Sequence, residues 1–280
     1  MTNKTLPKLD SHNMNWPTDW NNVFERSAPI ILEIGFGLGH FLEYLQSKHP
    51  DKNIFGIEIS NFCLVKAEKL VVRRGWDNVR VAFARAETTL NHLFEPESIS
   101  EIYINFPDPW FKERHSGRRL MQRDTLEAMV SRLKPGGKLY LATDIIAYAE
   151  MSHEILSKTA GLNNLLESAW VTEWEDRIVT KYEKKARNAG RDCYYFAYTR
   201  NENPVNHLPV IKELDMPHIV IETPITMETI FDRFEQAEYR DDDIRVKLLN
   251  AYIREQSLSG LEFMGVKIDK KKNKAASGES

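Results

Sequence analysis

The sequence predicts an α/β domain built on a mostly parallel sheet, followed by a smaller α+β module. Two observations predict this class. Short apolar runs rich in β-branched residues alternate with amphipathic stretches from residue 29 to residue 160, and most runs are followed by a helical pattern. Since parallel neighbours in a sheet need crossover connections, this order indicates βαβ units with helices on both faces.

The predicted elements follow one another in regular order. Strands are expected at residues 29–34, 53–59, 79–83, 101–106 and 138–142, and helices at 39–48, 61–74, 119–133 and 147–160. Residues 134–137 (KPGG) carry the signals that end a helix and make a turn. A late aromatic run at residues 192–200 is expected to close the sheet as an antiparallel strand.

A change of pattern at residues 201–204 (NENP) marks the candidate linker, so the first domain is expected to span residues 1–203. Residues 204–269 are expected to form the α+β module. Its elements would be a short apolar run at 218–222, helices at 227–238 and 243–255, and a strand at 261–268. The tail at 270–280, lysines followed by small polar residues, is expected to be disordered.

Composition bounds the class of protein. Hydrophobic residues make up 42% and charged residues 28%, which is typical of a soluble globular chain. No signal-peptide pattern or membrane-spanning run is recognised, so we expect a cytoplasmic protein without a membrane partner. Cys63 and Cys193 are too few and too far apart to suggest disulfides or a metal site. The sequence leaves a monomer and a homodimer equally open.

The net charge of −3 conceals two basic runs, at residues 112–123 and 181–191. Binding of nucleic-acid phosphates needs concentrated positive charge, which the average over the chain does not reveal. Either run alone could be a solvated helix face. Their position beside chemical motifs favours a nucleic-acid surface.

A glycine-rich turn follows the first predicted strand. Gly35, Gly37 and Gly39 stand at alternate positions where a helix begins, which allows the backbone to approach a ligand closely. Such turns bind nicotinamide, flavin or sulfonium nucleotides, and some only pack a helix on a strand. Glu33 favours a methyl donor with a cationic amino-acid portion, because a carboxylate would repel the pyrophosphate of a dinucleotide.

Two later strand ends would complete the nucleotide pocket. Glu58 closes the second strand, where a carboxylate can accept both ribose hydroxyls, although a nicotinamide enzyme would show this too. Residues 84–87 (ARAE) should face the adenine edge. Arg85 departs from the expected acceptor, because a guanidinium has only donors, so the backbone or Glu87 would have to read adenine.

The most specific segment, residues 105–120, follows the fourth predicted strand. Pro107 and Pro109 stiffen this loop and direct Asp108 at the pocket mouth, while Trp110 offers a flat face for stacking. The segment also supplies candidate phosphate contacts: Lys112, Arg114, Arg118 and Arg119.

This PDPW segment with its basic run resembles the bacterial tRNA (guanine-N7)-methyltransferase family. The resemblance extends over about residues 30–200. It implies a Rossmann-like class I methyltransferase sheet and S-adenosylmethionine as cofactor. It also implies N7 of a guanine in tRNA as the methyl acceptor, at position 46 of the variable loop.

Two further segments match the family. Asp144 closes the fifth strand and residues 180–183 (TKYE) precede the aromatic strand; alone, the first could be a helix N-cap and the second a turn motif. The resemblance implies that the cofactor is bound by Glu33, Gly35, Gly37, Gly39, Glu58, Arg85 and Asp108, of which Asp108 is also catalytic. It implies that the substrate is bound by Lys112, Arg114, Arg118, Asp144, Thr180, Lys181, Tyr182 and Glu183.

Three alternatives stay open at this point. A methyltransferase of small molecules would use the same sheet, with the basic runs incidental. An RNA-binding protein that has lost catalysis is suggested by Arg85 alone. A nicotinamide oxidoreductase would share the glycine turn and the acidic residue after the second strand.

Overall fold

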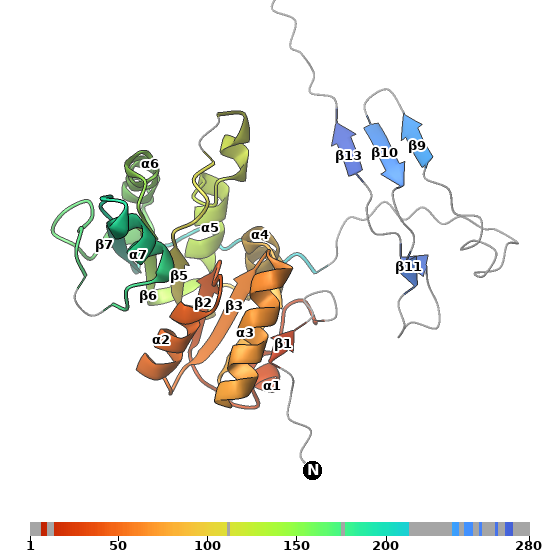
Figure 1. Cartoon of the computed structure of the whole chain (residues 1–280), viewed down its shortest axis with the longest axis horizontal. Helices are drawn as coiled ribbons and strands as arrows, with labels where there is room; N and C mark the ends of the chain where they lie inside the picture. Colours follow the sequence, from red (N-terminus) through yellow and green to blue (C-terminus); the bar gives the residue numbers. More distant parts are fainter. Residues whose placement is uncertain are drawn as a thin grey trace, which may run out of the picture. The chain divides into compact units, whose positions relative to one another are not determined.

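The computed structural model of the chain describes residues 7–9, 14–110, 113–174, 177–212, 237–240, 244–248, 252–253, 261–262 and 267–270. The chain forms two compact units, Met1–Asp215 and Met216–Ser280 (Figure 1). The first unit carries every residue for which the sequence predicts a role in chemistry, so it receives most of the description that follows.

The first unit is built on one eight-stranded sheet, with the order β1-β4-β3-β2-β5-β6-β8-β7. The strands are β1 (Lys8–Leu9), β2 (Ile30–Ile34), β3 (Asn53–Glu58), β4 (Val79–Phe83), β5 (Ile99–Asn105), β6 (Leu133–Thr143), β7 (Leu162–Asn164) and β8 (Tyr194–Arg200). The pairs from β1 to β6 are parallel, whereas β8 runs antiparallel to both β6 and β7. The predicted parallel sheet with a late antiparallel strand is confirmed.

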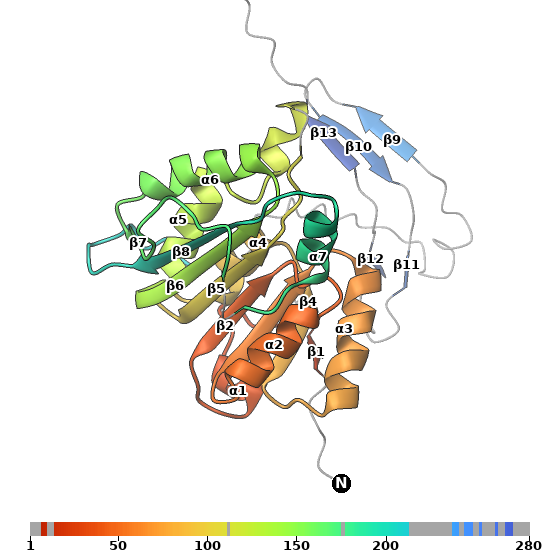
Figure 2. The same ribbon diagram turned by 60° about the vertical axis from the view of Figure 1, so that its left-hand side comes forward.

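Helices cover both faces of this sheet. They are α1 (Trp20–Phe24), α2 (His40–Lys48), α3 (Asn61–Arg74), α4 (Ala86–Thr88), the π-helical turn η1 (Thr89–Leu93), the 3-10 helix η2 (Glu113–Arg118), α5 (Arg123–Arg132), α6 (Ile146–Ser157) and α7 (Lys181–Asn188). Figure 2 shows α5 and α6 on one side of the sheet and α2, α3 and α7 on the other. In the described part of the chain, no helix has the length and apolarity needed to cross a membrane.

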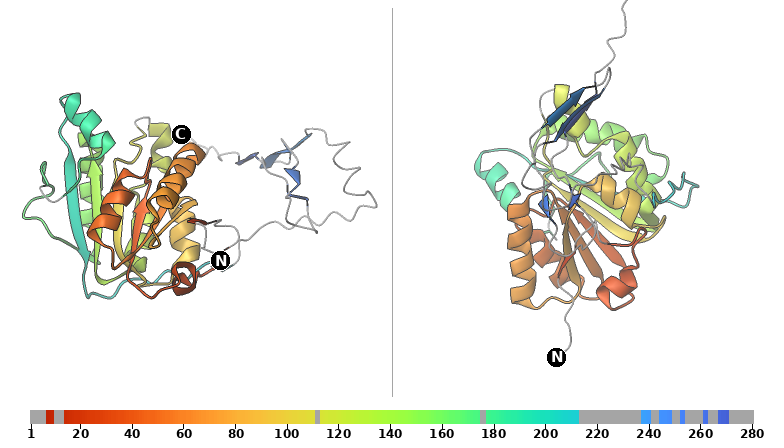
Figure 3. Two further views of the ribbon diagram at one scale, coloured as in Figure 1. Left: turned by 60° about the horizontal axis from the view of Figure 1, so that its bottom comes forward. Right: turned by 90° about the vertical axis from the view of Figure 1, so that its right-hand side faces the viewer.

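The alternation of side chains along the strands divides the core into two layers. Leu32 of β2 packs in the cluster that contains residues of α1, α5 and α6, whereas its neighbour Ile31 packs with residues of α2 and α3. A smaller cluster, which includes Ala186 and Tyr195, lies where α7 covers the antiparallel end of the sheet. Figure 3 shows α7 beside β8 at that end. Both faces of the central strands are therefore buried, as a parallel sheet requires.

Several element boundaries differ from the prediction. Helix α5 begins at Arg123 and not at residue 119, because Arg119 instead donates to the backbone carbonyls of Pro109 and Trp110. Strand β6 begins at Leu133, and the predicted turn at residues 134–137 is an irregularity within it, where the register with β5 shifts. Helix α7 was not predicted, because it is short and strongly polar and only Glu183 and Ala186 of its residues are buried.

The second unit differs from the prediction where it is described. Strands β9 (Ala237–Arg240), β10 (Ile244–Leu248) and β13 (Lys267–Lys270) form an antiparallel sheet, and β11 (Tyr252–Ile253) pairs with β12 (Leu261–Glu262). The predicted helix at 243–255 is therefore wrong, since its apolar residues Ile244, Val246 and Leu248 recur with the period of two that a strand shows. The end of the predicted helix at 227–238 lies in β9, and the predicted strand at 261–268 is two strands. The predicted elements at 218–222 and 227–236, and the tail beyond Lys270, lie outside the described residues.

The segment after β8 packs on the first unit instead of serving as a linker from residue 204. Arg132, whose side chain is fully buried, donates to the carbonyl oxygens of Leu90 (2.7 Å), Leu208 (2.6 Å) and Pro209 (3.3 Å). The His92 ring nitrogen Nδ1 lies 2.7 Å from the Ile211 carbonyl oxygen. The first compact unit thus extends to Asp215, beyond the boundary predicted after residue 203.

Replacement of Arg132 tests this attachment. We expect Arg132→Met to lower the free energy of unfolding by about 2–4 kcal/mol, because three carbonyl oxygens lose a charged donor inside the protein. Urea unfolding followed by circular dichroism measures the change. Lys134→Met, at an exposed position two residues away, is the control and should shift stability by less than about 0.5 kcal/mol. Equal stability of Arg132→Met and the wild type would contradict the attachment.

Candidate active site

The glycine-rich turn connects β2 to α2 in a conformation that needs its glycines. Gly35, Gly37 and Gly39 have φ angles of +78°, +56° and +84°, a region that L side chains rarely adopt. The backbone amides of Gly35 and Phe36 both donate to the Ile57 carbonyl oxygen of β3. The turn therefore keeps its backbone open toward the carboxyl ends of β2 and β3, where the sequence predicts a nucleotide.

Glu33 is a buried carboxyl at the end of β2, with 1% of its surface exposed. Strand β2 lies between β3 and β5, where Glu33 is level with Gly56 and Tyr103. Desolvation raises the pKa of Glu33 to about 8, while the Asn105 side chain and the Arg177 charge act in the opposite direction and Glu58 adds to the rise. The Glu33 oxygen Oε2 has no hydrogen-bond partner. Such a carboxyl is suited to receive a cationic ligand.

A small, solvent-open cavity lies in front of Glu33. Its walls come from the glycine turn, the start of α2, the end of β5 and the start of α7: Glu33, Gly35, Phe36, Leu38, His40, Phe41, Asn105, Thr180, Lys181 and Tyr182. Three segments that are far apart in the sequence thus meet at one edge of the sheet. Asn105 and the first residues of α7 were not assigned to the cofactor by the sequence.

Glu58 fastens the end of β3 to the glycine turn. One carboxylate oxygen accepts the Gly37 amide at 2.9 Å, and the other accepts the amides of Ile59 (2.8 Å) and Ser60 (3.1 Å). Each oxygen has lone pairs beyond these bonds, so a ribose hydroxyl could still donate to it. The half-buried Glu58 therefore has the position that the sequence predicts for a ribose ligand.

These residues fit S-adenosylmethionine, the cofactor that the sequence predicts. The unpartnered Glu33 oxygen could accept a hydrogen bond from its ammonium group, and Glu58 could accept one from its ribose. The glycines of the turn, which have no side chains, allow the cofactor to approach the backbone. Arg85 is exposed at the N-terminus of the short α4 and makes no side-chain capping bond there. Its predicted contact with adenine stays a prediction. Among the described residues, no three His, Cys, Asp or Glu side chains gather into a potential metal site.

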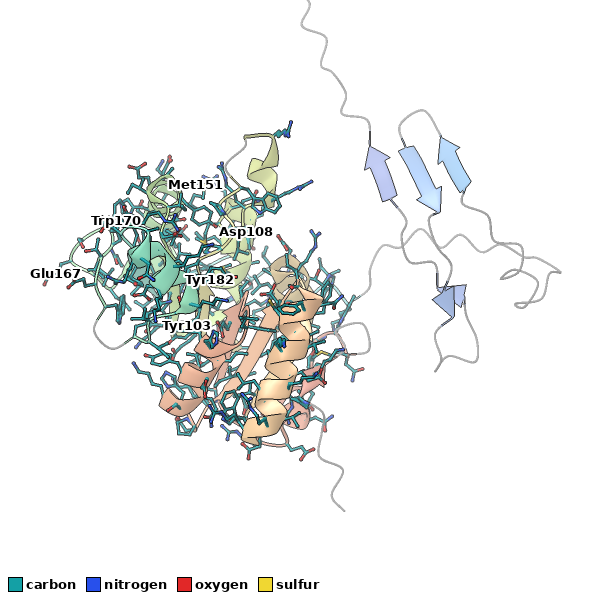
Figure 4. The ribbon with its side chains drawn as sticks, in the orientation of Figure 1. Tyr103, Asp108, Met151, Glu167, Trp170 and Tyr182 are labelled. Atoms are coloured by element: carbon teal, nitrogen blue, oxygen red, sulfur yellow. The ribbon has the colours of Figure 1, made fainter. Side chains whose placement is uncertain are left out.

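The loop after β5 holds Asp108 between two strained positions. Phe106 and Trp110 have φ angles of +52° and +44°, which bulky side chains avoid at a cost of about 1–3 kcal/mol each. The Arg119 guanidinium supports this shape from outside through its bonds to Pro109 and Trp110. The Asp108 side chain is exposed, and its charge acts on the Tyr182 hydroxyl (Figure 4).

The first basic run surrounds the same loop. The Arg118 guanidinium lies 5.2 Å from the centre of the Trp110 ring, and both Arg118 and Arg114 are exposed. Lys112 lies outside the described residues. The arginines of the run therefore have different positions: Arg119 holds the loop, whereas Arg114 and Arg118 face solvent beside it.

Thr180 and Glu183 form a capping box at the start of α7. The Thr180 hydroxyl accepts the Glu183 amide at 3.1 Å, and Glu183 Oε2 accepts the Thr180 amide at 3.4 Å. Glu183 Oε1 also accepts from Arg187 Nε at 3.0 Å, and both Thr180 and Glu183 are buried. These two residues thus stabilise the helix that carries their neighbours Lys181 and Tyr182.

Tyr182 extends from α7 across the glycine turn. Its ring atom Cε2 lies 3.7 Å from the position that a Cβ on Gly37 would occupy. Desolvation raises the pKa of the Tyr182 hydroxyl, with further contributions from the charges of Cys63, Glu58 and Asp108. The structure therefore brings the predicted substrate residues Lys181 and Tyr182 to the predicted cofactor turn.

Asp144, at the end of β6, is paired with a cation of the second basic run. Its Oδ2 lies 2.8 Å from Arg191, and the side chain is partly exposed. Ile145 occupies the N-cap of α6, and no side chain makes a capping bond there. The alternative interpretation of Asp144 as an N-cap is therefore wrong.

Comparison with known proteins gives a consistent result. A family described as "Putative methyltransferase" matches residues 27–196. The tRNA (guanine-N(7)-)-methyltransferase of Thermotoga maritima is 33% identical over 215 residues, which cover 77% of this chain and 68% of the relative. The Salmonella typhimurium protein of the same name is 37% identical over 189 residues, covering 66% and 77%. Among solved structures, a SAM-dependent methyltransferase from Aquifex aeolicus is 15% identical over 61% of this chain and 82% of the other, with a TM-score of 0.44.

Replacement of Glu33 tests its state in the free protein. The carboxyl is protonated in the folded protein up to about pH 8 but ionises near its ordinary value of 4.5 when unfolded. Stability is therefore lost as the pH rises from 4.5 toward 8, by a few kcal/mol in total. Glu33→Gln, which cannot ionise, should be more stable than the wild type by roughly 2–4 kcal/mol at pH 8, with no such gain at pH 4.5.

Thermal unfolding of both proteins across this pH range, without ligand, measures the difference. Glu154→Gln, a change at a fully exposed carboxylate, is the control and should give no comparable gain at pH 8. A constant difference between Glu33→Gln and the wild type at all pH values would contradict the assignment.

Proposed function

This chain belongs to the tRNA (guanine-N(7)-)-methyltransferase family, and we propose that its target is the guanine at position 46 of the tRNA variable loop. The protein transfers the methyl group of S-adenosylmethionine to N7 of a guanine in tRNA. This family decides against the nicotinamide alternative. The structural observation that carries the proposal is the position of the glycine turn and the Asp108 loop. They follow β2 and β5, which are neighbouring parallel strands and end at the same edge of the sheet.

Catalysis of this reaction depends mainly on how the two reacting groups are positioned. S-adenosylmethionine supplies an electrophilic methyl group on a sulfonium, so transfer forms a carbon–nitrogen bond and breaks a carbon–sulfur bond. Guanine N7 already has an in-plane lone pair, so no residue has to remove a proton from it. Orientation of reacting groups contributes roughly 7–11 kcal/mol in the best intramolecular reactions. The residues of the site therefore act by holding both partners in line.

Asp108 is the residue that we assign to the guanine. Its carboxylate is exposed, and no hydrogen bond to it is present within the described part of the chain. We propose that it accepts hydrogen bonds from N1 and N2 of the guanine. These donors lie on a different edge of the base from N7, so Asp108 would hold the ring in place without contacting the methylated atom. The methylated base is cationic, and a nearby carboxylate stabilises that charge electrostatically.

The remaining acidic residues, Asp144 and Glu183, differ in whether their carboxylate oxygens are available to the substrate. Asp144 has one oxygen paired with Arg191 and can accept from the substrate with the other. Glu183 is buried and bonded to Thr180 and Arg187, so its part in substrate binding, and that of Thr180, is to hold α7 in place. Lys181 and Tyr182, which α7 presents at the pocket, are the direct contacts that we propose on this side.

The tRNA phosphates are assigned to the exposed basic residues beside Asp108. Arg114 and Arg118 offer guanidinium groups, and Trp110 under Arg118 offers a ring for stacking. Lys112 belongs to this surface by sequence. We propose that the enzyme acts in the cytoplasm, as a monomer or a homodimer.

The function is tested by incubating the protein with unmodified tRNA transcripts and methyl-labelled S-adenosylmethionine, followed by nucleoside analysis. We expect label in 7-methylguanosine. A transcript with adenine in place of guanine at position 46 is the matched control and should stay unlabelled. Equal labelling of both transcripts would overturn position 46, and label in any other nucleoside would overturn the function.

Replacement of Asp108 tests its role in the reaction. Asp108→Asn keeps the shape of the side chain but removes the negative charge, so we expect turnover to fall by about 100-fold or more. The affinity for tRNA, measured by filter binding, should change less than about threefold, because the phosphate contacts remain. Asp124→Asn, an exposed acid on α5, is the control and should keep full turnover. Unchanged turnover of Asp108→Asn would refute the assignment.

A further inference from the structure

Behind the pocket wall, Arg177 places a guanidinium between two aromatic rings. Its central carbon lies 5.1 Å from the Phe41 ring of α2 and 5.1 Å from the Tyr195 ring of β8. One terminal nitrogen donates to Oδ1 of Asn105, which lines the pocket. Desolvation lowers the pKa of the group. The sequence singled out neither Arg177 nor Asn105.

The charge of Arg177 has no direct counter-ion in the described residues. No carboxylate there lies within 4.0 Å of it, and its Nε atom is buried without a hydrogen-bond partner. Removing a charge from water costs several kcal/mol unless nearby groups compensate. The acidic groups that its charge affects are Glu33 and Glu183. A half-buried cation that is linked to Glu33 through the Asn105 side chain needs an explanation other than stability.

Arg177, Asn105 and Glu33 each have a buried polar side-chain atom without a hydrogen-bond partner, and the Asn105 side chain also lowers the pKa of Glu33. These atoms are Nε of Arg177, Nδ2 of Asn105 and Oε2 of Glu33. Because Arg177 engages the Asn105 oxygen, the Asn105 amide nitrogen is the end left for other partners. The three atoms therefore offer two donors and a carboxylate acceptor. A zwitterionic α-amino acid needs that combination, with donors for its carboxylate and an acceptor for its ammonium.

We propose that Arg177 is a positioning residue for the amino-acid portion of the cofactor. It orients Asn105 through a hydrogen bond and, through its charge, favours the ionised form of Glu33 that an ammonium group requires. This inference rests on the cofactor of the proposed function. It concerns binding of the amino-acid portion, and it does not depend on which nucleic acid accepts the methyl group.

The other charged groups around Glu33 are known from the structure. Glu58 on β3 opposes ionisation of Glu33, and His40, Lys181 and Tyr182 line the same cavity from α2 and α7. Around Arg177 itself lie Glu183 on α7 and the hydroxyls of Tyr44, Tyr103 and Tyr195. Of the groups that act on Glu33, Arg177 is the one whose charge lowers its pKa. Removal of Arg177 should therefore raise that pKa further.

Two thioether ligands test the inference without catalysis. S-adenosylhomocysteine carries the zwitterionic amino acid, whereas 5′-methylthioadenosine has the same nucleoside without it. We expect Arg177→Met to weaken S-adenosylhomocysteine about tenfold or more in titration calorimetry and to change 5′-methylthioadenosine less than about twofold. The matched control is Arg80→Met, which removes another arginine that lies over an aromatic ring, Phe24, and should leave both affinities within about twofold.

The pH profile supplies a readout that loss of packing alone would not move. In the wild type, S-adenosylhomocysteine should bind more weakly as the pH falls below about 8, because Glu33 must lose its proton to bind the ammonium group. In Arg177→Met this loss of affinity should begin at a higher pH. Arg177→Lys keeps the charge and should keep the wild-type profile, with a weaker affinity because the bond to Asn105 is altered. If Arg177→Met does not fold, the affinity and pH profile of Arg177→Lys still test the inference.

The outcomes separate the inference from the function. Equal losses for both ligands, or a profile that does not move in Arg177→Met, would overturn the role of Arg177 while leaving the function intact. A wild-type protein that binds neither ligand would instead overturn the proposed function and the inference together. A selective loss for S-adenosylhomocysteine with a shifted profile would support both.

Discussion

The arrangement of the site depends on one constraint, the parallel hydrogen bonding of β2 to β3 on one side and to β5 on the other. Parallel neighbours end at the same edge of a sheet, so the residues at their carboxyl ends are brought together without any contact specific to the site. Glu33, Glu58 and Asn105 stand at these three ends. The glycine turn, the cavity and the Asp108 loop all extend from the same edge.

The sequence predicted those features that depend on residues close together in the chain, and it missed those that depend on distant residues. The bounds of α3 were predicted correctly, because Ser60 caps its start, Gly75 ends it and an apolar stripe joins the two. The glycine turn was recognisable for the same reason. The pairing of Arg177 with Asn105 was not, since it joins residues 72 positions apart and neither belongs to a pattern. Helix α7 was missed because it is short and strongly polar, and a capping box and the packing of Ala186 hold it in place.

The sequence also could not predict which basic residues remain available to bind phosphates. The run at 112–123 predicts a surface for phosphates, but the sequence treats its arginines as equivalent. In the structure, Arg119 is turned toward the loop backbone, whereas Arg118 lies over Trp110 and faces solvent. The φ angle of Trp110 lies in a region that bulky residues avoid, so the loop needs such support to keep its shape. Tertiary contacts, and not composition, decide which cations are left for a ligand.

The capping box at Thr180 and Glu183 has a consequence for how variants of this enzyme are interpreted. The first turn of α7 carries the side chains that we expect to contact the substrate, and it also contains the capping hydrogen bonds that hold this turn together. Loss of turnover after a change at Thr180 or Glu183 therefore cannot distinguish a missing contact from a frayed helix. Only exchanges that keep the capping geometry, such as serine at position 180, separate the two explanations. Inventories of essential residues that are compiled from alanine scanning will overcount the groups that contact RNA.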